Sequence, residues 1–242
     1  MFWFRESVGR VELAFTDRQG GVSEGPYGAL NLGSAGGDDR SRVVQNHALV
    51  AEALGVEGLH SMSQVHGRDV VLADVLRVDG SGTVPQCDGL VTTSAGMALL
   101  VRVADCVPVV LADPATGVVG AAHAGRVGMV EGVVAATVDR MRAEGARDVE
   151  AWIGPRACGR CYELPEEMVA AVESVVPGTR SVTSWGTPAV DVGAGVVSQL
   201  EALGVGVHDV GADTCTIEDE RFFSYRRQGT ASGRFGGVVV AR

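Results

Sequence analysis

The sequence predicts an α/β fold with some α+β character, a single layered domain over residues 1–242 in which helices flank mixed β-sheets. Three observations support this prediction. Consecutive apolar segments typical of strands dominate residues 89–122, and helical periodicity alternates with short strand-like segments after them. No linker divides the 242 residues, a length typical of one domain or of two tight lobes.

The first half of the chain contains one predicted helix among several predicted strands. Residues 11–16 alternate imperfectly between apolar and polar and indicate a strand, which a loop rich in Gly and Ser follows at 19–38. Asp39 is a typical N-cap for a helix that ends at Gly55. One face of this helix carries Val43, His47, Val50 and Leu54. Further strands are predicted at 69–73, 89–93, 98–103, 107–112 and 117–122.

The second half predicts three helices between short strands. Apolar residues recur at helical spacing from Val130 to Met141, and Gly145 ends this segment. A strand at 149–153, a turn that contains cysteines and a helix after Pro165 follow. Asp191 is the N-cap of the last helix, and Gly204 follows it. The final strands are predicted near 206–210, 221–225 and 237–241.

The composition excludes several classes of function. All 20 basic residues are Arg, and the absence of Lys excludes Schiff-base and pyridoxal phosphate chemistry, P-loop NTPases and ordinary protein kinases. The net charge of -10 argues against nucleic acid or an anionic membrane surface as a partner. Arg102 and Asp105 interrupt the richest apolar stretch, at 95–112, so we expect buried strands there and no membrane span.

The start of the chain and its cysteine count predict the compartment. Residues 1–6 do not show the basic region and apolar stretch of a signal peptide. Five Cys is an odd number in a chain too long to need disulfides. We therefore expect free thiols and a cytoplasmic protein.

Three separate segments each place a metal-ligand side chain beside small residues or turns. His66 lies in Gln-Val-His-Gly, Cys106 in Ala-Asp-Cys-Val-Pro, and His123 in Ala-Ala-His-Ala-Gly. Two His and one Cys could hold zinc and leave its fourth position open, the pattern of a catalytic site. The three residues are 40 and 17 positions apart, so no local motif joins them and unrelated positions remain an alternative.

Two further motifs have both a structural and a functional interpretation. Cys158-Gly159-Arg160-Cys161 is a C-x-x-C that could be a tight turn, half of a zinc knuckle or a redox pair, and no second C-x-x-C accompanies it. Cys87 and Cys215 are single, and we expect them either to be packed in the core or to lie next to the ligands of a metal site. The segment 222–227, Phe-Phe-Ser-Tyr-Arg-Arg, could be an ordinary amphipathic strand or could hold Arg226 near an anion such as phosphate.

These segments together resemble the YfiH-like laccase-domain family, whose members are described as purine nucleoside phosphorylases and were formerly described as polyphenol oxidases. The matches span nearly the whole chain. They lie at 16–23, 25–27, 30–33, 37–39, 64–67, 87–92, 104–108, 122–125, 153–155, 158–163 and 222–227.

The resemblance implies a metal-dependent enzyme with a fold related to toxin deamidase domains. His66, Cys106 and His123 match the family's metal ligands, with Zn²⁺ or Cu²⁺ as the ion. The implied activity converts adenosine, inosine and methylthioadenosine, with phosphate, into base and sugar 1-phosphate, and adenosine deamination accompanies it. We expect purine nucleosides and phosphate as the partners of a monomer or homodimer.

The candidate site residues extend beyond the ligands. Asp105 and Asp88 are the carboxylates predicted to take part in catalysis with Cys106, His66 and His123. Candidates for binding substrate or phosphate are Arg226, Arg126, Asn31 and Gln64.

The sequence departs from the family pattern after the second histidine. The family usually has His-Ala-Gly-Trp-Arg-Gly, whereas residues 123–128 are His-Ala-Gly-Arg-Val-Gly. The Trp is absent and the Arg lies one position earlier, at Arg126, which puts substrate choice and rate in question.

Three other functions remain open. Cys106 could be a thiolate nucleophile with His123 as its base in a metal-free hydrolase or amidase. Copper-linked oxidation of phenols is a second alternative, although five His are too few for a four-copper site. A degenerate member that only binds a nucleoside or a partner is the third.

Overall fold

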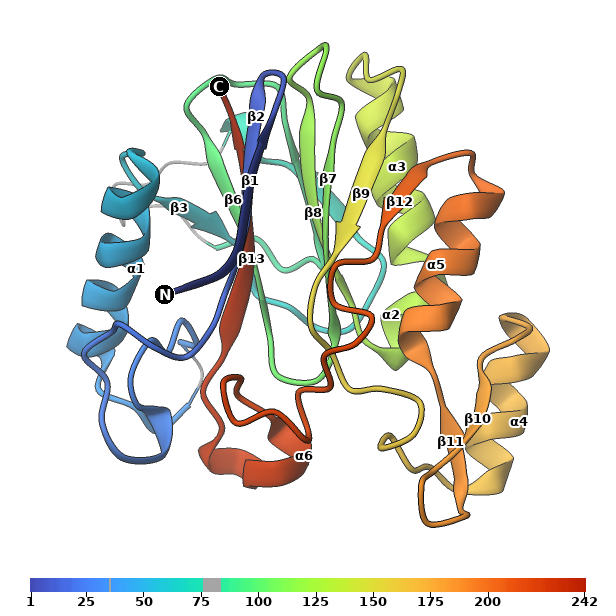
Figure 1. The fold of residues 1–242 in the computed structure, drawn as a ribbon. Helices are drawn as coiled ribbons and strands as arrows, with labels where there is room; N and C mark the ends of the chain where they lie inside the picture. Colours follow the sequence, from blue (N-terminus) through green and yellow to red (C-terminus); the bar gives the residue numbers. More distant parts are fainter. Residues whose placement is uncertain (35, 76–83) are drawn as a thin grey trace.

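The computed structural model describes residues 1–34, 36–75 and 84–242 and arranges them as two stacked sheets with helices on both outer faces (Figure 1). The first sheet has the strand order β1 (Phe2–Val8), β2 (Val11–Thr16), β13 (Phe235–Ala241), β6 (Ala98–Val103) and β3 (Leu59–Ser61). The second has the order β12 (Gly206–His208), β9 (Glu150–Ile153), β7 (Val107–Ala112), β8 (Val119–Ala124), β5 (Gly89–Thr92) and β4 (Val70–Leu72).

Both sheets are mixed, as predicted. β3 runs parallel to β6, and β4 and β12 run parallel to their neighbours β5 and β9, while the remaining pairs within the two sheets are antiparallel. The predicted layered α/β fold with flanking helices is confirmed. The strands predicted at 98–103 and 107–112 are β6 and β7 with the same bounds.

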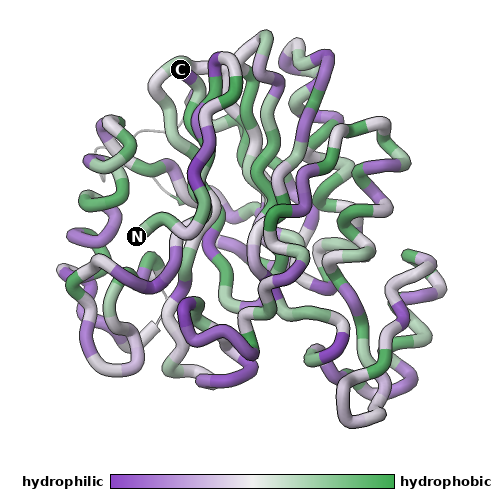
Figure 2. The backbone as a smooth tube through the Cα atoms, viewed as in Figure 1, coloured by the Kyte–Doolittle hydropathy of each residue, from purple (hydrophilic) through white to green (hydrophobic). Residues whose placement is uncertain are grey.

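The core fills the space between the sheets and the space beneath the helices on each side. In β6, Leu99 and Val101 face the second sheet, whereas Leu100 faces the helix on the outer side. Because both faces of the central strands are buried, their sequences are continuously apolar, and Figure 2 shows hydrophobic residues concentrated there. Truncating a fully buried Leu to Ala in such a layer costs about 2–5 kcal/mol of stability.

The helices follow the predicted caps. α1 (Arg40–Leu54) begins after Asp39, whose carboxylate accepts a hydrogen bond from the Ser41 N–H, and ends at Gly55 in the left-handed conformation. It covers the first sheet, and α2 (Arg126–Glu131), α3 (Val133–Ala143) and α5 (Val192–Ala202) cover the second (Figure 1). α4 (Glu166–Val175) packs against the small hairpin of β10 (Arg180–Val182) and β11 (Pro188–Val190).

The structure corrects the prediction of a strand at 221–225. Phe222 and Phe223 are both fully buried there, and α6 (Tyr225–Gln228) begins directly afterwards. The Ser224 side chain accepts a hydrogen bond from the Arg227 N–H, so this residue is an N-cap and not a strand position. The predicted alternation failed because the ring of Phe222 packs between Trp3 and Phe235, contacts that no local pattern reveals.

Other differences are smaller. β1, β3, β10 and β11 were not predicted, and the helix predicted from Val130 is divided at Gly132, whose φ of 88° permits a sharp change of direction. All five cysteines are free thiols. Within the described ranges, no helix combines the length and the apolar character needed to cross a membrane.

Candidate metal centre

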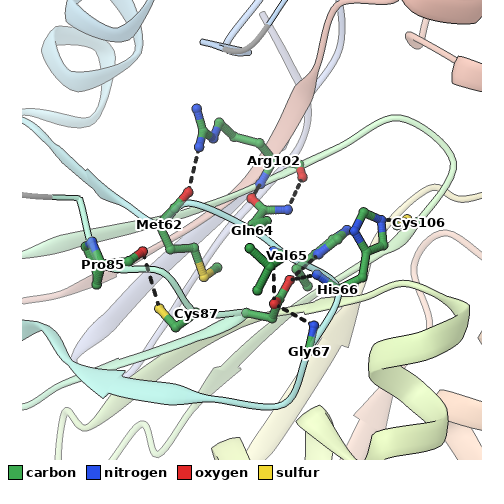
Figure 3. Close-up of polar contacts among 11 residues, drawn as sticks. Met62, Gln64, Val65, His66, Gly67, Pro85, Cys87, Arg102 and Cys106 are labelled. Carbon is green, nitrogen blue, oxygen red and sulfur yellow. Dashed lines mark hydrogen bonds and ion pairs between the residues drawn. The ribbon is translucent and has the colours of Figure 1, made fainter.

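Three side chains predicted to bind metal meet at one end of the central strands of the second sheet. His66 lies in the loop after β3, Cys106 directly precedes β7, and His123 is in β8, the antiparallel neighbour of β7. Their ligand atoms all lie within 4.8 Å of one another. The Cys106 Sγ is 3.7 Å from the His66 Nε2 (Figure 3), and the two imidazole rings meet edge to face at 4.7 Å.

The backbone around this cluster adopts conformations that bring the ligands close together. His66 and Asp105 have φ values of 63° and 88°, a region that residues other than Gly rarely occupy. Gly125 follows His123 by two residues, and a Cβ there would lie 2.7 Å from the His66 Cδ2 and 3.1 Å from the Cys106 Sγ. A side chain at position 125 would therefore displace two of the three ligands. Uncommon backbone conformations of this kind cluster at functional sites.

Asp88 holds the ring of His123 and the backbone of the loop that carries His66. Its Oδ1 accepts hydrogen bonds from the His123 Nδ1 at 2.7 Å and the His66 N–H at 3.0 Å, and its Oδ2 accepts from the N–H groups of Val65 and Gly67. Burial alone would raise the pKa of Asp88, but these hydrogen bonds outweigh it and lower the pKa. The ionised Asp88 holds the proton of His123 on Nδ1, which leaves the Nε2 lone pair free.

The donor set fits a divalent ion such as Zn²⁺. Burial lowers the pKa of His123 despite the adjacent Asp88, so its imidazole is neutral, as a metal ligand must be. Burial and the charge of Asp105 raise the pKa of the Cys106 thiol to about 12, and a bound cation would offset this effect. His66 is exposed, Cys106 is half-buried and His123 is buried, so the cluster opens to one side.

The open side faces a cavity of about 940 Å³ with four arginines in its wall, Arg102, Arg126, Arg226 and Arg234. None of their guanidinium groups forms an ion pair with a carboxylate in the described ranges. Burial and the charge of Arg234 lower the pKa of Arg102, so two mutually repelling cations lie in one wall. Such a wall favours an anionic ligand.

Arg102 and Arg234 were not among the predicted site residues. Arg102 donates to the Met62 carbonyl at 2.6 Å (Figure 3) and to the Ser34 hydroxyl at 2.8 Å, while its buried Nε has no partner in the described ranges. Arg234 donates to the carbonyls of Ser232 and Gly233, both at 2.8 Å. The signal for Arg102 was a charge inside an apolar strand, whereas nothing local marked Arg234.

Arg126 and Arg226, the predicted phosphate ligands, both line the cavity near Tyr162. The Arg226 guanidinium lies over the Tyr162 ring, 4.9 Å from its centroid, and donates to the Glu163 carbonyl at 3.1 Å. Arg126 is the first residue of α2 and lines the cavity, whereas Val127 does not. The departure from the family pattern therefore places a guanidinium in the wall at the position of the family's Trp.

Asn31 and Gln64 lie in the wall of the cavity, but their side-chain amides form hydrogen bonds with the protein backbone. The Gln64 amide makes two hydrogen bonds to the backbone of Arg102, at 2.7 and 3.0 Å (Figure 3). The Asn31 Oδ1 accepts from the N–H groups of Gly33 and Arg234, both at 2.8 Å. These contacts hold the two arginines that sequence reasoning missed.

Asp105 connects the ligand loop to the neighbouring segments. Its Oδ1 accepts from the Thr216 hydroxyl and its Oδ2 from the Arg226 N–H, both at 2.7 Å, and its carbonyl accepts from the Ala157 N–H at 2.9 Å. Each oxygen of this carboxylate is therefore already engaged.

Comparison with known proteins assigns the family. The family model described as multi-copper polyphenol oxidoreductase laccase matches residues 12–242. The chain belongs to this family. A purine nucleoside phosphorylase of Streptomyces griseus is 53% identical over 96% of this chain and 95% of its own length, and one of Mycobacterium tuberculosis is 43% identical over 95% and 92%.

Solved structures agree with the family assignment. A Neisseria meningitidis protein of the DUF152 family has a TM-score of 0.86 at 30% identity and covers 99% of this chain and 98% of its own. YlmD from Geobacillus stearothermophilus has a TM-score of 0.84 at 32% identity, covering 96% and 92%.

The chain has too few histidines in its cluster to bind the several copper ions that the family's description implies. Two of the five belong to the cluster, His66 and His123. His47 contacts the Leu32 carbonyl at 2.9 Å, and His208 pairs with Glu150 at 2.7 Å on the surface. The cluster offers ligands for one metal ion, with a single thiol among them.

Proposed function

We propose that this chain is a metal-dependent purine nucleoside phosphorylase that acts on adenosine, inosine and methylthioadenosine. The observation that carries the proposal is the combination of an open His-Cys-His cluster and four arginines around one cavity, none of which pairs with a carboxylate in the part of the chain that the structure describes. A nucleoside and a phosphate ion need an apolar pocket with a few polar groups and a cationic wall, respectively. The names of the relatives agree with this substrate class.

The metal ligands would be His66, Cys106 and His123, with Zn²⁺ as the ion that best suits two imidazoles and a thiolate. When bound, the ion supplies Lewis acidity that polarises an oxygen of the substrate or phosphate. Asp88 keeps the ring of His123 oriented and its proton on Nδ1.

In the proposed reaction, Arg102 and Arg234 bind the phosphate and hold one of its oxygens toward C1′ of the sugar. The new C1′–O bond forms as the bond from C1′ to the base nitrogen breaks, and the base leaves with the electron pair and takes up a proton. Arg126 and Arg226 line the same cavity beside Tyr162, where they would contact the nucleoside.

Adenosine deamination in the same cavity is the second activity that we propose. It needs a carboxylate that carries a proton between water and the base. Asp88 and Asp105 are the nearby candidates, and every oxygen of both already accepts a hydrogen bond from the protein. The cationic wall thus favours phosphorolysis over deamination.

The test is chromatography of adenosine incubated with the purified protein, with and without phosphate, beside the Cys106→Ala variant. Adenine that forms only with phosphate, and not with the variant, would support the phosphorylase. Inosine formed without phosphate would identify the deaminase. Binding of adenosine without product would support a degenerate binding protein. A protein that neither binds adenosine nor forms a product would contradict the proposal.

The remaining alternatives have separate tests. A metal-free hydrolase would lose activity to iodoacetamide after metal removal and would be protected by an amide substrate. A copper-linked oxidase would turn over phenols in proportion to enzyme and not to added copper.

We also propose that residues 1–242 act as one domain, as a monomer or homodimer in the cytoplasm.

A further inference from the structure

A second group of metal-ligand side chains lies outside the cavity. Cys158, Cys161, Cys215 and Glu218 each offer one ligand atom, and these atoms all lie within 4.8 Å of one another. None of the four lines the cavity. Cys161 and Cys215 are buried, Cys158 is half-buried and Glu218 is exposed. We call these four residues the thiol cluster.

Backbone contacts hold together the two segments that form the thiol cluster. An isolated parallel bridge pairs Arg156 with Cys215, and the Cys158 N–H donates to the Cys215 Sγ at 3.4 Å. Within the first turn the Cys161 N–H donates to the Cys158 carbonyl at 3.0 Å, and within the second the Glu218 N–H donates to the Cys215 carbonyl at 3.1 Å. The backbone therefore sets the positions of the three cysteines, while the exposed Glu218 reaches the cluster through its own longer side chain.

We propose that the thiol cluster binds a Zn²⁺ ion that has a structural role. Thiolates favour zinc over harder ions, and a closed set of four protein ligands is typical of structural zinc. Zinc binding displaces the three thiol protons into solvent, and no oxidant or reductant takes part. Half of a zinc knuckle is one of the three interpretations that the sequence allows for the C-x-x-C, and Cys215 and Glu218 would complete it from more than 50 residues later in the chain.

A disulfide is the competing use of these cysteines. A bond within the C-x-x-C would consume two sulfurs and leave Cys215 as an unpaired thiol beside it. A zinc ion, in contrast, engages all three sulfurs and the carboxylate together. The third sulfur and the nearby carboxylate are thus explained by a metal site and not by a disulfide.

The proposed zinc would link two segments that contribute side chains to the cavity wall, the one that contains Tyr162 and the one that contains Arg226. Tyr162 directly follows Cys161, and Arg226 lies eight residues after Glu218. These two side chains stack in the cavity wall, while Asp105 ties Thr216 and Arg226 to the loop that carries Cys106. The thiol cluster would therefore position Tyr162 and Arg226 without touching a substrate.

The zinc content of the reduced, zinc-reconstituted protein tests this proposal. Elemental analysis and native mass spectrometry would compare the wild type with Cys158→Ser, Cys215→Ser, Cys106→Ala and, as a matched control, Cys87→Ala. We expect Cys158→Ser and Cys215→Ser each to bind one zinc fewer than the wild type, and Cys87→Ala to bind the same number. Wild-type zinc content in Cys158→Ser and Cys215→Ser would overturn the proposal.

The outcome does not depend on the proposed phosphorylase activity. If the cluster of His66, Cys106 and His123 holds no metal, the wild type still carries the zinc that Cys158→Ser loses, and Cys106→Ala retains it. The two sites are therefore scored separately.

A second measurement covers the case in which the Cys158 and Cys215 variants fail to fold. Co²⁺ bound to the Cys106→Ala chain should give thiolate-to-metal charge-transfer absorption with the intensity of three thiolates. Absence of that absorption would overturn the proposal. So would a denatured mass of the unreduced wild type that is lower by two hydrogen atoms, because it would reveal a disulfide.

Discussion

The candidate metal centre, formed by His66, Cys106 and His123, and the thiol cluster offer similar ligand atoms in different arrangements. The metal centre draws His66, Cys106 and His123 from three distant segments and leaves one side open to a cavity with a cationic wall. The thiol cluster draws four ligands from two tight turns, and none of them lines the cavity. Three protein ligands with an open position suit chemistry, whereas four ligands in a closed set suit stability. The number and origin of the ligands thus distinguish the two sites better than the residue types do.

The largest effect on this comparison should come from Cys106→Ala. Loss of a ligand should lower the rate of phosphorolysis by more than about 100-fold, because mutating a residue that only supports a ligand already lowers metal affinity or activity by about 10–100-fold. The thermal midpoint of the metal-free protein should change little, because the thiol is only half-buried. Turnover and the midpoint of thermal unfolding are the measurements. Wild-type turnover in a folded variant would contradict a role for this cluster.

Gly125→Ala should disturb the metal centre without removing a ligand. Its Cβ would lie 2.7 Å from His66 and 3.1 Å from Cys106, and misplacement of reacting groups by about 1 Å can cost roughly 100-fold in rate. Metal content and turnover would be measured together. Gly206→Ala is the control, because a Cβ there would meet its nearest neighbour at 3.4 Å. Equal turnover in the two variants would show that the close approach is unimportant.

Asp88→Asn should weaken the metal centre and spare the thiol cluster. The Asn cannot accept the four hydrogen bonds that Asp88 accepts with its two oxygens, and loss of such support costs about 10–100-fold in metal affinity. Competition with a chromophoric chelator measures the affinity. Equal weakening of both sites would indicate general unfolding, and Asp88 would then have no specific role.

Arg102→Gln and Arg234→Gln should raise KM for phosphate by about 10–100-fold, the equivalent of one charged hydrogen bond. KM for the nucleoside should rise less. Arg221→Gln is a matched control, because this surface arginine pairs with Asp219 and does not line the cavity. Unchanged KM for phosphate in both cavity variants would place the phosphate elsewhere, with Arg126 and Arg226 as the next positions to test.

Asp113→Asn should have the smallest effect on turnover while changing the pH dependence of stability. Asp113 is buried at the end of β7, and hydrogen bonds from the N–H groups of Arg147, Thr116 and Ala115 outweigh burial and lower its pKa. Its ionised form therefore stabilises the fold above about pH 4, the unfolded pKa, and this stability is lost as pH falls through the folded pKa. Urea unfolding between pH 7 and pH 3 should show the variant to be less stable at pH 7, with the difference shrinking in acid. A constant difference would contradict this assignment.

The local sequence determined the elements whose signals lie within one turn or one strand. Asp39 and Gly55 delimit α1 because an N-cap carboxylate and a left-handed C-cap act on adjacent backbone groups. The apolar sequences of β6 and β7 predicted both strands with their observed bounds, because burial on both faces leaves a continuous pattern. The residues alone offered the His-Cys-His cluster only as one interpretation, since its members are 40 and 17 positions apart, and the family resemblance singled it out.

The tertiary structure alone decided the features that depend on distant segments. It placed Arg234 beside Arg102, completed the C-x-x-C with Cys215, and converted the predicted strand at 221–225 into buried aromatics and a short helix. In each case the deciding contact joins residues more than 50 positions apart, Phe222 with Trp3 among them. Periodicity and capping act through neighbouring backbone groups, so they determine elements, whereas the packing of those elements determines which side chains share a site.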